Sequence, residues 1–463
     1  MSNASISKSV VWQLSSKFAL QGMIFFTTPI FTRILSSADY GYISLFQSWV
    51  SIFMLVLGLQ TYGSIGNARI KLGEDKMPEY LSSIMTLSLC SLVLLFPFLI
   101  IFADKLSVLL GLKKDMVYLC FIYSFSSYVV CFVVGKYDAF KQVEKSTIVS
   151  IIQSLSSISL SLIFVVIFSN NKALAKIYGQ AIPVILLSIF FIVKIYIEGK
   201  KIWNSHYIKY CLTLSVPLIL HGLGHVIFAQ CDRIMLNKMM GASFLGVYSV
   251  AFSLCSVLSI IYGALNSAWV PFYYDYKKKG DTESILLHSK RYIKFFLLIS
   301  MGFLLLSTDV FKIMAPEEYW DGIKIIPIFV ISHFFNFLYL FPINYEFFSE
   351  KTKLIPIGTL LASVVNLIIN FCMIPRYGIT GAAVGTLIAH ILLFLFHFLL
   401  SKNIKSQKFD YSLIFFIPYT LLLVCVAPVI CIYFSELYIA RWSMALGIAI
   451  YLFYDIIKKR SIF

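Results

Sequence analysis

Long apolar runs follow one another along the chain, separated by short polar turns. They measure roughly 18–24 residues, enough to cross a hydrocarbon core of about 30 Å as an α-helix. The alternation typical of a membrane barrel strand is absent, and helices satisfy their backbone groups without water. The pattern therefore predicts an all-α polytopic membrane protein with about 14 transmembrane helices. The expected spans are 11–32, 42–66, 81–102, 116–135, 146–168, 178–196, 210–231, 244–266, 291–312, 322–345, 354–373, 382–400, 411–434 and 440–457.

Composition supports this prediction. Of 463 residues, 59% are apolar and 13% charged, and the mean hydropathy is +0.86. A soluble protein carries about a quarter charged residues, so most of this chain must face lipid. The first run is too long for a signal-peptide core and lacks a small-residue cleavage site, so we expect an uncleaved helix. The nine cysteines are scattered, without a metal or disulfide spacing.

Basic residues indicate the orientation. If the N-terminus is cytoplasmic, roughly two lysines or arginines fall on that side for each one on the other, so both termini are expected inside. This asymmetry accounts for the net charge of +16 without a nucleic-acid partner. Because nothing resembles a nucleic-acid module, we expect the basic surface to face anionic lipid headgroups of the bilayer.

Two stretches of the chain resemble each other. They are "TPIFTRILSSADYGYIS" (28–44) and "AQCDRIMLNKMMGASFLGVYS" (229–249). Arg33 and Arg233 are 200 positions apart, and Gly41 and Gly246 are 205 apart. Six spans on each side of a cytoplasmic connector predict two parallel halves, related by a pseudo-two-fold along the membrane normal. The expected division is 1–203 for the first bundle, 204–403 for the second and 404–463 for a C-terminal helix pair.

The loops do not favour an enzyme. None is long enough to fold as a domain, and we find no catalytic constellation, no metal site and no phosphate-binding GxxxxGK[ST] loop. Two helical halves around a shared cavity are typical of a transporter that works by alternating access. We therefore expect a transporter without a cofactor.

A polar stripe on the first helix is the main candidate for the cavity wall. Gln13, Lys17 and Gln21 are spaced four residues apart, so they share one helix face. A charge at membrane depth is costly and therefore indicates function. The alternative is that Lys17 extends to the inner headgroups.

The seventh span carries further candidates. His221 and His225 are four residues apart, and either line the cavity or bond neighbouring helices; two histidines alone are not a zinc site. Asp232 and Arg233 are expected to end this helix at the outer boundary, as an ion pair or gate.

Asparagines and serines at helical spacing suggest contacts between helices. Asn366 and Asn370 share a face and either join helices or contact sugar. The serines of the fifth span repeat at heptad-like intervals, which predicts a small-residue seam of close helix packing. They are Ser150, Ser154, Ser157 and Ser161.

The chain as a whole resembles a known family. The opening stretch, "DRIML…GASFLGVYSVAFSL" (232–254), "NLIINFCMIPRYGITGAAVGT" (366–386) and the fourteen spans are similar to Wzx-type polysaccharide flippases. These belong to the multidrug/oligosaccharidyl-lipid/polysaccharide exporter superfamily. Its members enclose a central cavity between two six-helix bundles, and only some carry the last helix pair.

The resemblance implies a substrate and site roles. The substrate would be an undecaprenyl-diphosphate-linked oligosaccharide, such as an O-antigen (lipopolysaccharide) or capsule repeat unit, moved to the periplasmic leaflet of a bacterial inner membrane. Lys17 would contact the diphosphate, since that anion cannot cross hydrocarbon unaided. Arg33 and Arg233 would act near the exit. The cytoplasmic entrance would use Arg69, Arg291 and Lys294, and the sugars would meet Gln13, Gln21, Asn366 and Asn370.

The resemblance also concerns coupling and partners. Coupling to protons or sodium ions is compatible with it, with His221, His225 or Glu346 as proton carriers, although Glu346 lies near a span end and is expected to face solvent. A polysaccharide polymerase and a chain-length regulator are implied partners.

Three alternatives stay open. An ion-coupled multidrug exporter of the same superfamily would need buried carboxylates for cations, whereas most acidic residues here are in loops. A lipid II flippase shares the expected fold. A membrane glycosyltransferase or polymerase is disfavoured by the short outer loops.

Overall fold

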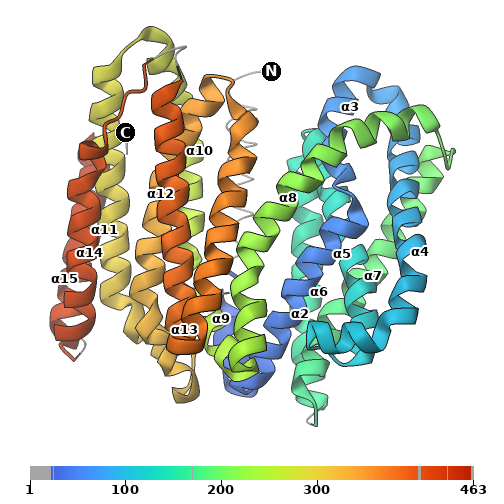
Figure 1. Cartoon of the computed structure of the whole chain (residues 1–463), viewed down its shortest axis with the longest axis horizontal. Helices are drawn as coiled ribbons and strands as arrows, with labels where there is room; N and C mark the ends of the chain where they lie inside the picture. Colours follow the sequence, from blue (N-terminus) through green and yellow to red (C-terminus); the bar gives the residue numbers. More distant parts are fainter. Residues whose placement is uncertain (1–21, 24, 169, 405–407, 435, 460–463) are drawn as a thin grey trace. The chain divides into compact units, whose positions relative to one another are not determined.

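The fold was examined in a computed structural model that describes residues 22–23, 25–168, 170–404, 408–434 and 436–459. These residues form helices and turns without a strand. The chain divides into two compact units, Met1–Gly246 and Val247–Phe463. Each unit is a bundle of long helices (Figure 1). The expected division at residue 203 rests on internal homology and stays a prediction.

Unit 1 contains the first helix, described over 25–34, and seven further helices with the beginning of α9. The C-terminal part of α9 belongs to unit 2. The bounds are α2 Ser37–Gly58, α3 Ile65–Leu72, α4 Met77–Leu110, α5 Lys114–Ala139, α6 Val143–Ile167, α7 Lys172–Gly199, α8 Ser205–Met240 and α9 Ala242–Cys255. Short 3₁₀ turns at Thr61–Ser64 and Glu74–Lys76 flank α3.

The start of α2 is set by a capping box. The Ser36 hydroxyl accepts the backbone N–H of Asp39, and the Asp39 carboxylate accepts the backbone N–H of Ser36, both at 3.2 Å. The helix ends at Gly58 because Leu59 and Gln60 adopt left-handed φ angles of 49° and 51°. The expected second span, 42–66, was therefore wrong at its end, where the chain turns into α3.

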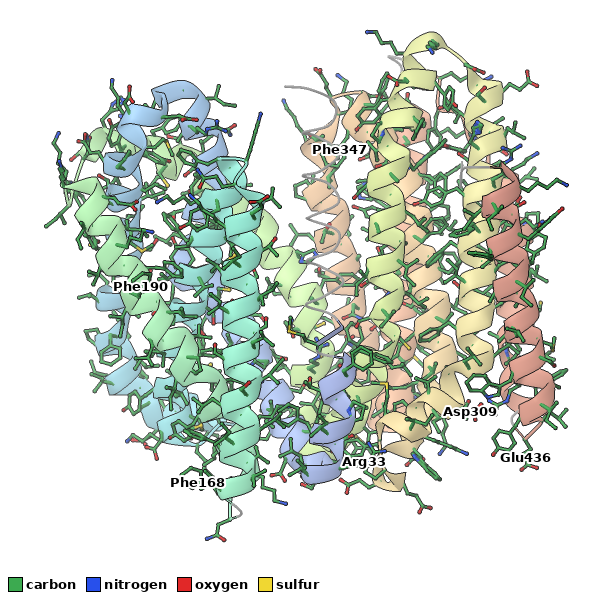
Figure 2. All side chains as sticks on the ribbon, turned by 180° about the vertical axis from the view of Figure 1, so that it is seen from behind. Arg33, Phe168, Phe190, Asp309, Phe347 and Glu436 are labelled. Carbon is green, nitrogen blue, oxygen red and sulfur yellow. The ribbon has the colours of Figure 1, made fainter. Side chains whose placement is uncertain are left out.

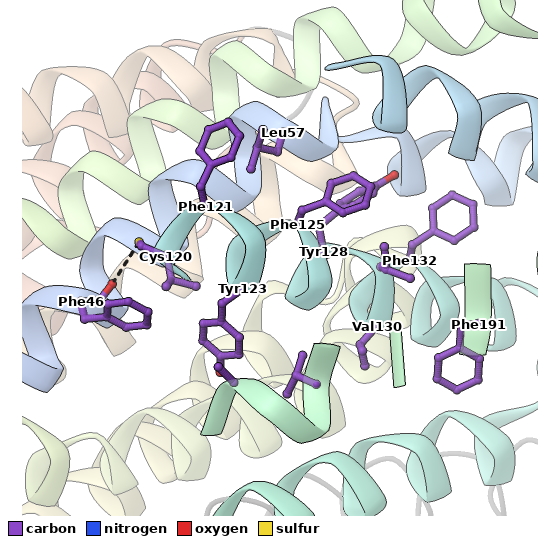
Figure 3. Packing of buried hydrophobic residues seen from close by; sticks show 14 of the residues in the cluster. Phe46, Leu57, Cys120, Phe121, Tyr123, Phe125, Tyr128, Val130, Phe132 and Phe191 are labelled. Atoms are coloured by element: carbon purple, nitrogen blue, oxygen red, sulfur yellow. Dashed lines mark hydrogen bonds between the residues drawn. The ribbon is translucent and has the colours of Figure 1, made fainter. Parts of the chain in front are cut away.

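Helix α5 forms the centre of unit 1. Its side chains pack against α2, as Figure 3 shows, with Phe121 5.8 Å from Phe53 and Tyr123 6.0 Å from Phe46 between ring centroids. The buried Tyr128 hydroxyl bonds to the Thr61 and Ser88 hydroxyls, so the polar end of this ring is satisfied in an apolar core. The seam predicted for the fifth span lies between α6 and α7, where Ser157 and Ser161 donate to backbone carbonyls of α7.

The connector between α7 and α8 is held against α4. Lys201 pairs with Glu79 at 2.8 Å, and the Asn204 amide donates to the same carboxylate at 3.1 Å. The hydrogen bond to Glu79 raises the pKa of Lys201. Asn204 also caps α8, because its side-chain oxygen accepts the backbone N–H groups of His206 and Tyr207.

Unit 2 contains the rest of α9 and six further helical elements. They are α10 Val257–Lys279, α11 Thr282–Met314, α12 Ile326–Phe348, α13 Ile355–Asn403, α14 Leu413–Tyr433 and α15 Tyr438–Lys459, with 3₁₀ turns at Glu317–Ile325 and Thr352–Leu354. Aromatic rings of α11 and α12 fill its centre, with the Phe296 and Phe337 centroids 4.5 Å apart.

The element α13 is two helices joined at Gly378, whose φ of 57° and ψ of −130° break the helical path. The two arms run antiparallel, since Gly385 lies against Asn370 of the first arm and Gly358 against His397 of the second. One element therefore supplies both spans predicted at 354–373 and 382–400.

The predicted helical membrane architecture is confirmed. Twelve stretches of the described residues are long and apolar enough to cross a membrane, and one of them contains both arms of α13. The first expected span lies mostly outside the described residues. The seventh helix, however, continues to Met240, so the expectation that Asp232 and Arg233 end it was wrong. The residues from Ile234 to Met240 extend the helix instead.

Gly41 and Gly246, which occupy matching positions in the two similar stretches, lie against each other's helices within unit 1. A Cβ on Gly41 would overlap the Ala242 carbonyl oxygen, and a Cβ on Gly246 would overlap the Ser37 carbonyl oxygen. Helices α2 and α9 therefore approach through their backbones, which is how small residues permit helix association in a bilayer.

Gly41→Ala should destabilise the protein by about 1–3 kcal/mol, because the added methyl group forces these two backbones apart. Thermal unfolding in detergent would measure the loss. Gly66→Ala is the matched control: open space surrounds Gly66 on α3, so alanine should be neutral or stabilising by up to about 1 kcal/mol. Equal stability of the two variants would contradict the close crossing.

Candidate functional site

The leading sequence-based candidates cannot be placed. Gln13, Lys17 and Gln21 lie outside the described residues, as does the side chain of His221. His225 is exposed on α8. Their assignment to a cavity wall therefore stays a prediction.

The two repeat arginines have the same local geometry. Arg33 donates to the Pro29 carbonyl oxygen at 2.8 Å, and Arg233 donates to the Ala229 carbonyl oxygen at 2.9 Å, in each case four residues earlier. Arg33 is exposed and lies at the same end of unit 1 as Phe168 (Figure 2). Asp232 is buried beside Cys231, whose thiol lies 3.6 Å from its carboxylate.

The two asparagines lie at the interface between the two arms of α13. Asn366 and Asn370 are fully buried, and the Asn370 amide donates to the Asn366 side-chain oxygen at 3.2 Å. A Cβ on Gly385 would overlap the Asn370 side chain, so the pair lies directly between the arms of α13. Contact with sugar stays a prediction for these residues.

The three predicted entrance residues lie in different settings. Arg69 donates to Glu74 at 2.6 and 2.9 Å and to the Ala139 carbonyl oxygen at 2.6 Å, so it ties α3 to the end of α5. Arg291 and Lys294 line a pocket of unit 2 between α11, α14 and α15. Lys294 donates to the Tyr451 hydroxyl at 2.9 Å.

A buried lysine of unit 1 was missed from the sequence. Lys176 is 6% exposed, and its ammonium lies 3.9 Å from the centroid of Phe31 and 4.9 Å from that of Tyr40. Among the described residues, no carboxylate pairs with it. The expected span began at residue 178, whereas α7 begins at Lys172, so the sequence pattern assigned Lys176 to an outer loop.

A buried carboxylate of unit 2, bonded to a histidine, corrects another expectation. Glu346 is fully buried rather than solvent-exposed: its carboxylate lies 2.9 and 3.0 Å from His397 Nδ1 and accepts the Ser401 hydroxyl at 3.3 Å. His397, on the second arm of α13, is also fully buried, with its ring 5.1 Å from Tyr339. The pair links α12 to α13, a contact that spacing along the chain could not reveal.

Two further carboxylates of unit 2 whose side chains are largely shielded from solvent also have partners. Asp410 accepts both Lys277 at 2.8 Å and the Tyr273 hydroxyl at 3.4 Å. Asp309 accepts Arg441 at 2.9 Å. Asp309 lies at the same end of the unit as Glu436, opposite to Phe347 (Figure 2). The residues that the structure describes contain no cluster of three or more potential metal ligands.

A sequence profile of the family described as polysaccharide biosynthesis protein matches residues 6–277, more than half of the chain. The chain belongs to this family. The resemblance noted from the sequence is thereby confirmed.

Two relatives and one solved structure extend the comparison. Lsg locus putative protein 1 of Haemophilus influenzae is 26% identical over 369 residues, covering 77% of this chain and 87% of its own length. The probable low-salt glycan biosynthesis flippase Agl15 of Haloferax volcanii is 22% identical over 405 residues, covering 84% and 82%. The lipid II flippase MurJ, in an inward closed conformation, superposes with a TM-score of 0.68 at 16% identity over 97% of this chain and 99% of its own.

Family and fold together define the class of protein. The chain is a multi-pass membrane protein of the polysaccharide biosynthesis family, and it has the fold of the MurJ flippase structure.

Glu346→Ala should lower the free energy of unfolding by about 3–5 kcal/mol, because removing one partner leaves His397 and Ser401 without their buried acceptor. Denaturation in detergent micelles would measure it. Glu350→Ala, four residues later and exposed, should change stability by less than about 0.5 kcal/mol. If both variants unfold like the parent, the buried pair is contradicted.

Proposed function

We propose that this protein is a flippase for undecaprenyl-diphosphate-linked oligosaccharide repeat units of the O-antigen or capsule type. It would move the headgroup from the cytoplasmic to the periplasmic leaflet by alternating access, with both termini in the cytoplasm. Membership of the polysaccharide biosynthesis family supports this proposal, as does a relative named as a glycan biosynthesis flippase.

The observation that carries the proposal is a buried lysine of unit 1 that has no carboxylate partner among the described residues. In unit 1 Lys176 rests on two aromatic rings, without a carboxylate among the described residues. In unit 2 Glu346, Asp410 and Asp309 are each bonded to a basic side chain. A cation kept inside the protein without a counter-ion favours an anionic cargo such as a diphosphate.

In this proposal Lys17 and Lys176 neutralise the diphosphate at different stages of its passage. Lys17 would act within the first helix. Lys176 lies one turn inside α7 and packs on Phe31 near the end of the first helix. Arg33 and Arg233 would act near the exit.

Ion coupling is part of the proposal. A fully buried carboxylate and imidazole can share one proton and exchange it when the helices around them move. Glu346 and His397 are therefore the proposed proton carriers. This replaces His221 and His225 as the leading candidates, since His225 is exposed and His221 is outside the described side chains.

A lipid II flippase is the second candidate, because the MurJ structure shares this fold over nearly the whole chain. The two cargoes share the undecaprenyl diphosphate and differ in the glycan. Complementation of strains that lack one or the other flippase separates them: rescue of repeat-unit export alone would support the proposal. A multidrug exporter is less favoured, because Glu346, Asp410 and Asp309 of unit 2 are already bonded to basic groups.

Lys176→Met should reduce export about tenfold while leaving stability unchanged or higher. Methionine keeps the packing on Phe31 and Tyr40 and removes the charge, and a charged contact to cargo contributes about 1.5–3 kcal/mol. The measurement is the rate at which lipid-linked glycan becomes accessible on the periplasmic face, at equal protein level. Lys105→Met, at an exposed position of α4, is the control. Normal export by the Lys176 variant would remove this residue from the proposal.

Lys17→Ala should reduce the same export rate, and Lys17→Arg should be milder because it keeps the positive charge. Protein level and thermal stability serve as controls. An unchanged rate for Lys17→Ala would show that this lysine only reaches toward the inner headgroups.

A further inference from the structure

A basic pocket of unit 2 lies among α11, α14 and α15, which stand side by side in Figure 1. Its volume is about 180 Å³. Three basic residues of α11 line it together with two tyrosines and one carboxylate from α14 and α15. They are Lys290, Arg291, Lys294, Tyr419, Tyr451 and Asp455.

The pocket carries an excess of two positive charges, since three basic groups face one carboxylate. Lys294 is fixed by Tyr451, which accepts a hydrogen bond at 2.9 Å and presents its ring 5.1 Å away. Lys290 and Lys294 are exposed and Arg291 is half-buried. The basic groups can therefore reach an anion that arrives from outside the protein.

Polarity changes along the pocket. Helices α11 and α15 run antiparallel, since Asp309 pairs with Arg441 and Lys294 with Tyr451. Leu298 lies seven residues beyond Arg291, which is about 10 Å further along α11. The wall there is apolar at Leu298 of α11, and Leu452 of α15, next to Tyr451, adds an apolar side chain near the level of Lys294. Large apolar side chains of α14 and α15, including Leu421 and Phe453, are more than half exposed and so face lipid.

We propose that this pocket binds the headgroup of an anionic glycerophospholipid of the phosphatidylglycerol type. The phosphodiester lies between Arg291 and Lys294, a headgroup hydroxyl reaches Asp455, and an acyl chain follows the apolar wall. Basic pockets between helix ends on the cytoplasmic side are suited to such headgroups.

Size favours a phospholipid over the cargo. Pockets for drug-sized ligands measure about 300–1,000 Å³, so a site of about 180 Å³ holds a glycerol phosphate and not an oligosaccharide. The proposal thus gives Arg291 and Lys294 a resident lipid instead of the cargo entrance expected from the sequence. It does not depend on the identity of the cargo.

The test uses the purified full-length protein in mixed micelles, with phosphatidylglycerol as the probe and phosphatidylcholine as the neutral lipid. Lys290→Gln/Arg291→Gln/Lys294→Gln should weaken phosphatidylglycerol binding at least tenfold, because each basic residue near the surface contributes about 1 kcal/mol. Tyr451→Phe, which removes the hydrogen bond that fixes Lys294, should weaken it about two- to threefold. Bound lipid is counted by native mass spectrometry.

The control removes the same charge elsewhere on the unit. Lys278→Gln/Lys279→Gln/Lys402→Gln changes three exposed residues and should leave phosphatidylglycerol binding within twofold of the parent. The unfolding temperature of each variant in phosphatidylcholine micelles reports its folding. If the triple pocket variant does not fold, Arg291→Gln alone should still weaken binding several-fold.

A second probe, undecaprenyl diphosphate, distinguishes the two sources of a lipid phosphate. Its binding should be the same for the parent and the pocket variant. Loss of undecaprenyl diphosphate binding with normal phosphatidylglycerol binding would overturn the proposal and make the pocket a cargo entrance. An equal loss of phosphatidylglycerol binding in the pocket and control variants would also overturn the proposal, because it would show a general effect of charge. The two binding tests do not depend on the export assay, so a protein that fails to export the glycan would still give the same binding results.

Discussion

A charged group inside the hydrocarbon layer must find its partner within the protein, and the described helices are arranged around this constraint. In unit 2 the ion pairs join elements that are distant in sequence: Glu346 with His397, Lys277 with Asp410, and Asp309 with Arg441. These pairs connect α12 to α13, α10 to the segment before α14, and α11 to α15. Unit 1 uses a different solution, because Lys176 rests on aromatic faces. That difference supports an anionic cargo in the proposed function.

Close backbone contacts complement the ion pairs. Gly41 and Gly246 allow α2 and α9 to touch, Gly179 approaches the backbone of Ser161 across α6 and α7, and Gly385 lies on Asn370. In lipid the hydrophobic effect does not drive helices together, so such close contacts and the hydrogen bonds beside them contribute much of the stability of helix packing. A transporter needs both kinds of contact, since its helices must pack firmly and still change their arrangement.

The fold was largely predictable from the sequence, because the length and apolarity of a segment are enough to identify a membrane-spanning helix. Arg33 and Arg233, which suggested the repeat, make the same local hydrogen bond, and the repeat itself stays a prediction. The site was less predictable. The predicted span started six residues after the beginning of α7, so Lys176 was assigned to a loop. The contact between Glu346 and His397 joins two helices, and no periodicity along the chain indicates it. Lys17 lies outside the described residues, so its assignment still rests on the sequence.

Reconstitution of the purified protein into liposomes tests the central claim most directly. The measurement follows a fluorescent undecaprenyl-diphosphate-linked oligosaccharide from the inner leaflet to the outer leaflet, and a cationic dye in parallel vesicles. Our account predicts protein-dependent transfer of the lipid-linked glycan and none of the dye. Transfer of the dye without transfer of the glycan would contradict it.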